Sequence, residues 1–303
     1  MDMNQGKGIF YAALAGVMWG LLAIALKITL SSYYLTPFTI VWFRFSTAFV
    51  LLALFLVFTQ PSLFRVFVRP PLKLIGASIC LGFNYYSYMR GLDYTTPSNA
   101  QVFSQLGPVL FAVTGIYLFR EKVSWRHVMG FLIVLSGLSL FYWEQMGAMA
   151  NQKGYVTGVI WVIASTVAWV FYALWQKELL RTYSAHQLNL FIYGVCGLLF
   201  SAGMRTEGFA SLDSTGWLLV IFLGLNTLIA YGAIAVAFKF LESHRVSVIV
   251  ALNPIVTFVV MHLLAAGGVA LIVPEHLSTT TLLGAATALS GSIFVILFTR
   301  RKG

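Results

Sequence analysis

Long apolar segments, separated by short polar ones, recur along the whole chain. Each has about 20 residues, the length that an α-helix needs to cross the hydrocarbon core of a bilayer. They are continuous and lack the alternation over roughly ten residues that is typical of a membrane β-strand. The pattern predicts an all-α integral membrane protein with ten transmembrane helices, at residues 8–30, 36–59, 72–91, 97–118, 126–143, 154–175, 185–204, 215–239, 245–268 and 280–299.

The composition agrees with this prediction. The chain has 303 residues, of which 59% are hydrophobic and 9% charged, and its mean hydropathy is +0.87. A soluble domain of this length is much less apolar, so the expected environment is a lipid bilayer and no soluble domain is expected. No small-residue cleavage pattern follows the first segment, which is as long as a full span. We therefore expect it to remain as a helix rather than to be removed as a signal peptide.

Lysine and arginine are unevenly distributed between alternate loops. If both termini are cytoplasmic, the outer helix ends hold only Arg90, Lys153 and Arg205, and most of the 19 Lys and Arg residues lie in the inner loops and at the termini. Short loops rich in these residues stay in the cytoplasm, so we predict a multi-pass protein of a bacterial-type inner membrane with both termini inside. The formal net charge of +10 follows from this topology, and no nucleic-acid partner is predicted.

The two halves of the chain contain an internal repeat. The segment EKVSWRHVMGFLIVLSG at 121–137 aligns with EHLSTTTLLGAATALSG at 275–291, and QLGPVL aligns with ALNPIV. The matched pairs are Trp19 with Trp169, Lys27 with Lys177, Asn84 with Asn226, Pro108 with Pro254, and Glu121 with Glu275. Because five helices per repeat is an odd number, the second copy would enter the membrane from the opposite side. We therefore predict two inverted five-helix repeats, at 1–150 and 151–303, an architecture typical of transporters.

Several motifs resemble one transporter family. They are GVMWGLLAIALK, RFSTAFVLL, TTPSNAQVFSQLGPV, and the E-x8-G-x6-G spacing at the start of the fifth and tenth predicted helices. Together they resemble the EamA family of the drug/metabolite transporter superfamily over almost the whole chain. The resemblance implies a ten-helix chain that functions as a monomer, with a central cavity between its halves. It also implies transport of amino acids or other small metabolites, with the substrate left open.

Arg44 places a positive charge inside the apolar segment TIVWFRFSTAFVLL. It lies about 12 Å from the outer end of its predicted helix, where a charge is costly in lipid and should face a cavity or a partner. Arg44 could bind a substrate carboxylate, or it could be structural and bind helix-end carbonyls or the outer carboxylate of Asp93. Lys27 lies closer to a helix end and is expected to extend to the interface.

The fourth predicted helix carries polar residues on one face. The same side of this helix carries Ser98, Gln101, Gln105 and Pro108. These residues would line a transport path or bond neighbouring helices. Pro108 and its repeat mate Pro254 lack a backbone N–H in mid-helix, which predicts kinks that act as hinges.

Aromatic and amide side chains also share helix faces. Trp161, Ser165, Trp169 and Tyr172 lie along one face of the sixth predicted helix, deeper than an interfacial aromatic belt requires. If such faces point inward, the cavity suits flat or apolar solutes with one polar end; the alternative is helix packing. The predicted substrate-binding residues are Trp19, Arg44, Asn84, Tyr85, Tyr88, Gln101, Gln105, Trp161, Trp169, Tyr172, Asn226, Tyr231 and Asn253.

Several chemistries are not supported by the sequence. No HExxH, GxSxG, Walker A or dinucleotide-binding pattern is present, so we predict neither an enzyme nor a cofactor or metal site. No Asp or Glu lies in the middle of a predicted helix, which argues against exchange of cations for protons. Cys80 and Cys196 lie within predicted helices and are interpreted as packing residues.

These observations favour a secondary transporter that exports a small organic metabolite, such as an amino acid, by alternating access. Transport would run on the substrate gradient or on a coupled ion. Within the transporter class, the alternative is a carrier of nucleobases, vitamins or drug-like compounds, because an aromatic cavity also suits planar rings. An alternative of another class is a lipid-handling or scaffolding membrane protein without an aqueous path.

Overall fold

The computed structural model describes residues 3–95, 97–121, 123–149, 154–267 and 278–298. Within these ranges the chain forms α-helices and two short 3-10 helices, with no strand, which confirms the all-α prediction. The repeat match Glu275 lies outside the described residues. The α-helices are α1 Met3–Ser32, α2 Pro37–Thr59, α3 Leu72–Tyr94, α4 Pro97–Ser104, α5 Leu106–Phe119, α6 Trp125–Met149, α7 Tyr155–Leu179, α8 Ala185–Ser201, α9 Ser214–Phe240, α10 Ser243–Val250, α11 Asn253–Ala266 and α12 Thr279–Phe298; the 3-10 helices are η1 Pro61–Phe67 and η2 Glu207–Ser211.

Several helices meet the length and composition required to cross a bilayer. Among the described residues there are five such segments, Asn4–Ser32, Pro37–Thr59, Tyr155–Leu179, Ser214–Phe240 and Ser243–Ala266. A sixth arises if η1 and α3, which are bent by 87° relative to each other, form one span. Three further apolar helices are shorter: Leu106–Phe119, Val128–Leu140 and Ala185–Ser201.

Polar residues in the short connections start several helices. The side chains of Thr36, Ser184 and Asp213 accept hydrogen bonds from backbone amides in the first turns of α2, α8 and α9. Such caps satisfy N–H groups that have no partner within the helix. The helices therefore begin where apolar segments meet capping residues.

Two of the predicted helices are divided, where the sequence predicted kinks at prolines. Gln105 separates α4 from α5, and residues 251–252 separate α10 from α11. Pro108 and Pro254 then lie in the first turns of α5 and α11. A proline is tolerated there because the first four amides of a helix have no partner within the helix. Each proline thus follows an interruption of the helix and lies in the first turn of the helix that comes after it.

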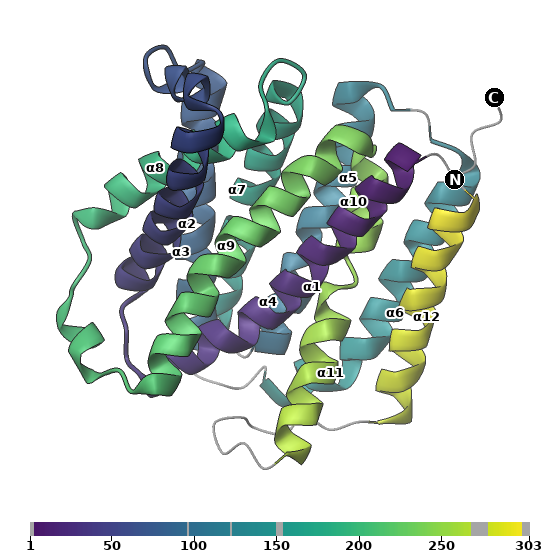
Figure 1. The fold of residues 1–303 in the computed structure, drawn as a ribbon. Coiled ribbons are helices and arrows are strands. Elements are labelled where there is room, and N and C mark those ends of the chain that lie inside the picture. The colour runs from purple at the N-terminus through teal and green to yellow at the C-terminus, as the bar shows by residue number, and fades with distance from the viewer. Residues whose placement is uncertain (1–2, 96, 122, 150–153, 268–277, 299–303) are drawn as a thin grey trace.

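The helices pack mainly in four pairs, α3 with α7, α6 with α12, α1 with α9, and α2 with α8. Figure 1 shows α6 and α12 side by side at one edge of the molecule and α2 near α8 at the other. Small residues allow the close approaches. A Cβ atom on Gly91 of α3 would lie 2.5 Å from Val162 of α7, so this pair has no room for a larger side chain.

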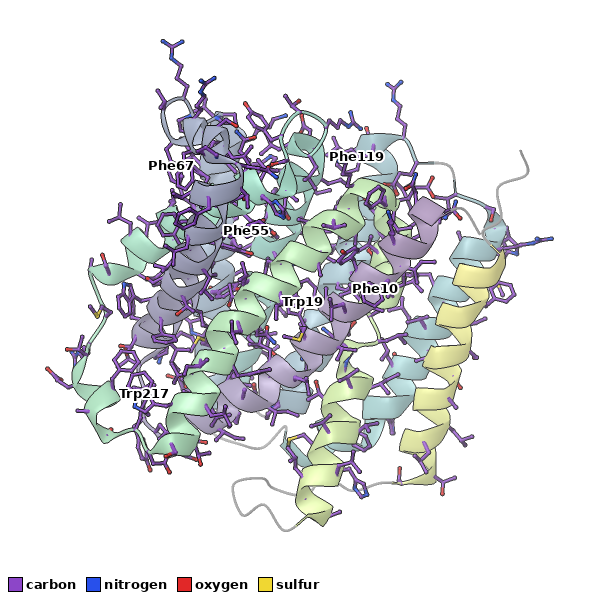
Figure 2. All side chains as sticks on the ribbon, in the orientation of Figure 1. Phe10, Trp19, Phe55, Phe67, Phe119 and Trp217 are labelled. Atoms are coloured by element: carbon purple, nitrogen blue, oxygen red, sulfur yellow. The ribbon has the colours of Figure 1, made fainter. Side chains whose placement is uncertain are left out.

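Large apolar side chains cover the outside of the bundle. Phe10 on α1 is 63% exposed and Phe55 on α2 is 53% exposed, whereas Trp19 on α1 is buried between helices (Figure 2). An exposed apolar surface of this kind is unfavourable in water and suits contact with lipid. The polar groups described next lie inside the bundle.

Candidate functional site

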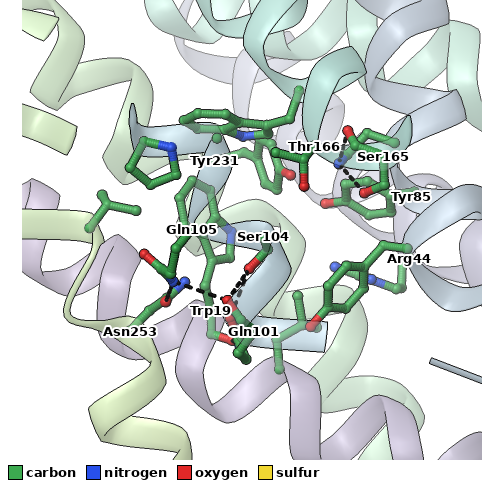
Figure 3. A pocket seen from close by; sticks show the side chains of 17 residues that line it. Trp19, Arg44, Tyr85, Gln101, Ser104, Gln105, Ser165, Thr166, Tyr231 and Asn253 are labelled. Atoms are coloured by element: carbon green, nitrogen blue, oxygen red, sulfur yellow. Dashed lines mark hydrogen bonds between the residues drawn. The ribbon is translucent and has the colours of Figure 1, made fainter. Parts of the chain in front are cut away.

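A cavity of about 110 Å³ lies inside the bundle, between residues from both halves of the chain. Figure 3 shows side chains from several helices converging on it. Most of the predicted site residues come together here. The cavity is lined by Trp19, Arg44, Asn84, Tyr85, Tyr88, Gln101, Gln105, Pro108, Trp169, Tyr231 and Asn253. Two of these residues, Gln105 and Pro108, lie at the α4–α5 break, and Asn253 begins α11 after the second break.

Two predicted aromatic residues do not line the cavity. Trp161 is half-buried on α7 and packs edge-on against Tyr86 of α3, with ring centroids 6.1 Å apart. Tyr172 is fully buried on α7, with its ring centroid 5.7 Å from that of Tyr231. Trp161 packs outside the cavity, and Tyr172 lies behind its lining.

Asn226 and Pro254 are also placed outside the cavity lining. Asn226 Nδ2 donates a 2.7 Å hydrogen bond to the Met18 carbonyl and so connects α9 to α1. Pro254 follows Asn253 in the first turn of α11. The repeat match between Asn226 and Asn84 therefore does not extend to cavity lining, because only Asn84 reaches the cavity.

Smaller lining residues were not predicted as site residues. They are Leu22, Ser104, Gly107, Ser165, Thr166 and Val250. Ser165 lies one helical turn before Trp169, so the face shared with Trp169 was a signal for it. Small hydroxyl and apolar side chains are common throughout membrane helices, and their presence alone does not mark a cavity.

Four rings form an aromatic wall, which we define as Trp19, Tyr85, Trp169 and Tyr231. The Trp19 ring lies 5.9 Å from Trp169 and 5.5 Å from Tyr231, in edge-to-face arrangements. The Tyr85 ring lies 5.5 Å from Tyr231. Because the rings come from α1, α3, α7 and α9, the wall joins both halves of the chain and offers apolar surface with hydroxyl edges.

Amide side chains on another side of the cavity bond one another and the backbone. Gln105 Nε2 donates to Asn253 Oδ1 at 2.9 Å, which connects the two helix breaks. Gln101 Nε2 donates to the Trp19 carbonyl at 3.3 Å, and Asn84 Nδ2 donates to the Ser165 carbonyl at 2.9 Å. Among the described residues, Gln105 Oε1 has no hydrogen-bond partner, so it is a buried acceptor with unused hydrogen-bonding capacity.

Arg44 is 2% exposed and lines the cavity. Its Nε donates to Thr227 Oγ1 at 3.0 Å, and its Cζ lies 4.2 Å from the centroid of the Tyr85 ring. Its Nη2 has no hydrogen-bond partner in the described part of the chain. Asp93, one of the structural partners considered for Arg44, pairs instead with Arg90 at 3.1 Å. Arg44 is therefore a buried cation held by a hydroxyl and an aromatic ring.

Lys27, which the sequence predicts to extend to the membrane interface, is half-buried and bonds the end of a neighbouring helix. Its Nζ donates to the carbonyls of Leu92 and Thr95, at 2.9 and 3.0 Å. These carbonyls lie at the C-terminal end of α3, where backbone acceptors have no partner within the helix and favour a cation. Lys27 thus fixes the end of α1 to the end of α3.

A second polar cluster lies outside the cavity, around Glu121 in the α5–α6 connection. Glu121 Oε1 accepts hydrogen bonds from Lys177 Nζ at 2.9 Å and from the Ser243 amide at 2.8 Å, and Oε2 lies 3.1 Å from His244 Nδ1. Burial raises the pKa of the Glu121 carboxyl, but His244, Lys177 and the Ser243 amide outweigh this effect and hold the pKa well below its usual range. The carboxylate therefore ties α7 and α10 to the α5–α6 connection.

Comparisons with known proteins agree with this architecture. Residues 6–143 and 156–297 match the model of the EamA-like transporter family. An uncharacterized transporter of Haemophilus influenzae is 32% identical over 295 residues, which cover 97% of this chain and 95% of the relative. The uncharacterized inner membrane transporter YhbE of Escherichia coli is 31% identical over 299 residues, covering 97% and 92%. A solved crystal structure with 19% identity superposes with a TM-score of 0.74 over 98% of this chain and 99% of that one, which shows a shared fold.

A more distant relative has a named substrate. It is the aromatic amino acid exporter YddG of Ancylobacter novellus, 22% identical over 161 residues, which cover 52% of this chain and 54% of the relative. The family and the names of the relatives indicate a transporter, which is not an enzyme class. Since the family model matches nearly all of both halves, this chain belongs to the EamA-like transporter family of membrane proteins.

Proposed function

We propose that the chain is a secondary transporter that exports a small organic metabolite by alternating access through the central cavity. The observation that carries this proposal is the cavity itself, which is internal, lies among apolar helices and is lined by residues from both halves. Binding sites at the interface between repeats are typical of transporters that alternate between two open states. A scaffolding protein has no need of such a site, and a lipid-handling protein would be expected to have a wide opening toward the bilayer instead.

We propose that the chain contains ten membrane-spanning segments arranged as inverted repeats at 1–150 and 151–303. The four main helix pairs support this organisation. If each helix is replaced by its match in the other repeat, the α3–α7 pair becomes the α9–α1 pair. The α2–α8 and α6–α12 pairs are unchanged, because each joins two matching helices. The two ranges that match the family model fall one in each proposed repeat. The two lysines matched by the repeat make equivalent hydrogen bonds. Lys27 donates to the Thr95 carbonyl at the end of α3, and Lys177 donates to the Leu241 carbonyl at the end of α9.

The helix breaks are the proposed hinges. The α4–α5 break lies in the first repeat and the α10–α11 break in the second, and both contribute to the cavity lining. The hydrogen bond from Gln105 to Asn253 connects them. Rotation at these breaks would move one half of the cavity relative to the other, as hinge residues at element ends do in other proteins. Pro108 and Pro254 would keep the starts of α5 and α11 rigid during this motion.

We further propose an inner-membrane location, cytoplasmic termini and a monomeric transporter. The Lys and Arg distribution supports the orientation. The relative YhbE is named as an inner membrane transporter, which supports the location. Residues from both halves of a single chain line the cavity, and the proposed monomer would form its site from these two halves.

The proposed substrates are small metabolites with an apolar or planar body and one polar end, and the first group of candidates is amino acids together with other small carboxylic acids. The aromatic wall supplies the apolar surface, and Arg44 with the unpaired Gln105 Oε1 supplies polar contacts. The distant relative named as an aromatic amino acid exporter supports this class. Nucleobases and vitamins are the second candidates, since planar rings also fit an aromatic wall.

Counterflow in proteoliposomes tests the proposal. Vesicles are loaded with one unlabelled pool (amino acids and other small carboxylic acids, nucleobases and vitamins, or cationic drugs), and entry of the matching labelled compound is followed with and without a pH gradient. We expect saturable exchange of an organic metabolite that needs no pH gradient. Exchange of cationic drugs alone, driven by a pH gradient, would contradict the substrate class, and no exchange from any pool would favour the lipid-handling alternative.

A further inference from the structure

We propose that the cavity selects small organic monocarboxylates as anions, which Arg44 binds through charge-assisted hydrogen bonds while the aromatic wall holds the rest of the molecule. This inference rests on the proposed function, because it names the substrate class of the same cavity. It differs from recognition of amino acids as zwitterions, since it assigns no role to a substrate ammonium group.

The first observation is the charge of the cavity. Arg44 is the only charged side chain among the described residues that line it. Within the described part of the chain, the ion pairs found elsewhere do not include Arg44, whose Nη2 also lacks any hydrogen-bond partner. A buried ion without a counter-charge is strongly unfavourable. An anionic ligand would supply the missing counter-charge.

The second observation is the positioning of the guanidinium. Thr227 fixes Arg44 through Nε at 3.0 Å, and the Tyr85 ring lies beside Cζ at 4.2 Å. Figure 3 shows the Arg44 nitrogen atoms directed toward the centre of the lining side chains. A planar guanidinium held on one edge and one face has N–H groups left that match a planar carboxylate, which is the geometry that favours arginine over lysine.

The third observation is the lack of a negatively charged partner for a cation. None of the described lining residues is Asp or Glu. A substrate ammonium would lie near Arg44 without a carboxylate to neutralise it, and burial of such a charge is unfavourable. The amide oxygen of Gln105 accepts a hydrogen bond from a neutral donor equally well. The lining therefore favours a net negative ligand over a zwitterion or a cation.

Cavity size limits the body of the ligand. The volume is about 110 Å³, somewhat below the roughly 150 Å³ of an apolar cavity that admits benzene. The aromatic wall provides most of the apolar contact through Trp19, Trp169 and Tyr231. The ligand class is therefore a monocarboxylate whose body is no larger than about one six-membered ring.

Calorimetric binding to the purified full chain in detergent at pH 7 tests the inference. The probes are benzoate, 4-hydroxybenzoate and 3-methylbutanoate, each compared with its primary amide, together with benzylamine and phenylalanine. At least one acid should bind about tenfold more tightly than its amide, the effect of a hydrogen-bonded charge, and more tightly than benzylamine or phenylalanine. Equal binding of acids and amides, tighter binding of benzylamine or phenylalanine, or no binding of any acid would overturn it.

Variants assign the preference to Arg44. Arg44→Gln should remove the preference for the acid and leave amide binding within about twofold, whereas Arg90→Gln, which changes an arginine outside the cavity lining, should keep it. A folded Arg44→Gln protein that keeps the preference overturns the proposal. If Arg44→Gln does not fold, Thr227→Val removes the hydroxyl that positions the guanidinium and should weaken acid binding alone; the acid–amide comparison on the natural chain decides in every case.

Counterflow separates this inference from the proposed function. If acid binding depends on Arg44 but neither that acid nor any of the other pools is exchanged in proteoliposomes, transport is overturned and anion recognition stands. Exchange of a metabolite by a protein that binds acids and amides equally would overturn anion recognition and leave transport standing.

Discussion

Gly137 of α6 and Gly291 of α12 make reciprocal contacts across one helix pair. A Cβ atom on Gly137 would lie 2.8 Å from the Gly284 carbonyl oxygen, and a Cβ atom on Gly291 would lie 2.9 Å from the Gly130 carbonyl oxygen. These four glycines are repeat mates, since Gly130 aligns with Gly284 and Gly137 with Gly291. Each repeat thus presents the same small-residue surface to the other, as a two-fold relation between the proposed repeats requires.

The first prediction concerns this contact. Gly137→Ala should destabilise the protein by about 1 to 3 kcal/mol, because the added methyl group has no space between the two backbones. The matched control is Gly232→Ala in α9, where a Cβ atom would meet none of the described residues within 4 Å; it should be neutral or stabilising by up to about 1 kcal/mol. Thermal unfolding in detergent measures both. Equal stability of the two variants would contradict the close approach of α6 and α12.

The second prediction concerns the Glu121 cluster. Glu121 has a side chain only 6% exposed and holds Lys177, His244 and the Ser243 amide. Glu121→Gln removes the charge from a buried ion pair and should lower stability by about 3 kcal/mol at pH 7. The control Glu178→Gln, at an exposed pair with Lys73, should change stability by less than about 1 kcal/mol.

The stability contributed by Glu121 should also depend on pH. Its pKa is lowered in the folded protein, so the contribution is fully present above the unfolded value of about 4.3 and is lost as the pH falls through the folded value. The difference in unfolding temperature between the natural chain and Glu121→Gln should therefore be constant from pH 7 to about pH 5.5 and shrink below it. A difference that grows as the pH falls would show that the carboxyl is protonated in the folded state.

The third prediction concerns the link between the helix breaks. Gln105 donates to Asn253 at 2.9 Å, and both side chains are buried. A double-mutant cycle with Gln105→Ala and Asn253→Ala should give a coupling energy of about 1 kcal/mol in unfolding by SDS. A parallel cycle with Gln105→Ala and Asn84→Ala should give none, since Asn84 bonds Ser165 instead. Additive effects in the first cycle would exclude a direct link between the breaks.

The sequence predicted helix positions well because each apolar segment must satisfy its backbone hydrogen bonds internally. It did not predict the breaks at Gln105 and at residues 251–252. A proline pattern alone is compatible both with a kinked helix and with a helix that starts just before the proline. Which of these occurs depends on tertiary contacts, here the bond between Gln105 and Asn253.

The candidate site was predictable in part for a related reason. Helical spacing placed Trp169 on the inner face of α7 together with Ser165, and both line the cavity. The same spacing included Tyr172, which packs behind the cavity lining, because spacing defines a face but not the depth at which a neighbouring helix covers it. The Thr227 partner of Arg44 depends on how α2 packs against α9, and sequence periodicity within one helix contains no information about that packing.

The last prediction tests the orientation of the chain in the membrane. After Cys80 and Cys196 are replaced by alanine, single cysteines are introduced as Arg65→Cys in η1 and Glu207→Cys in η2, two exposed positions. The α2–α3 connection that contains η1 and the α8–α9 connection that contains η2 lie at opposite ends of the bundle (Figure 1). With cytoplasmic termini, a membrane-impermeant maleimide added to intact cells should label Glu207→Cys and should label Arg65→Cys only after the cells are opened. The reverse pattern would place both termini outside, and labelling of both positions in intact cells would contradict a single orientation.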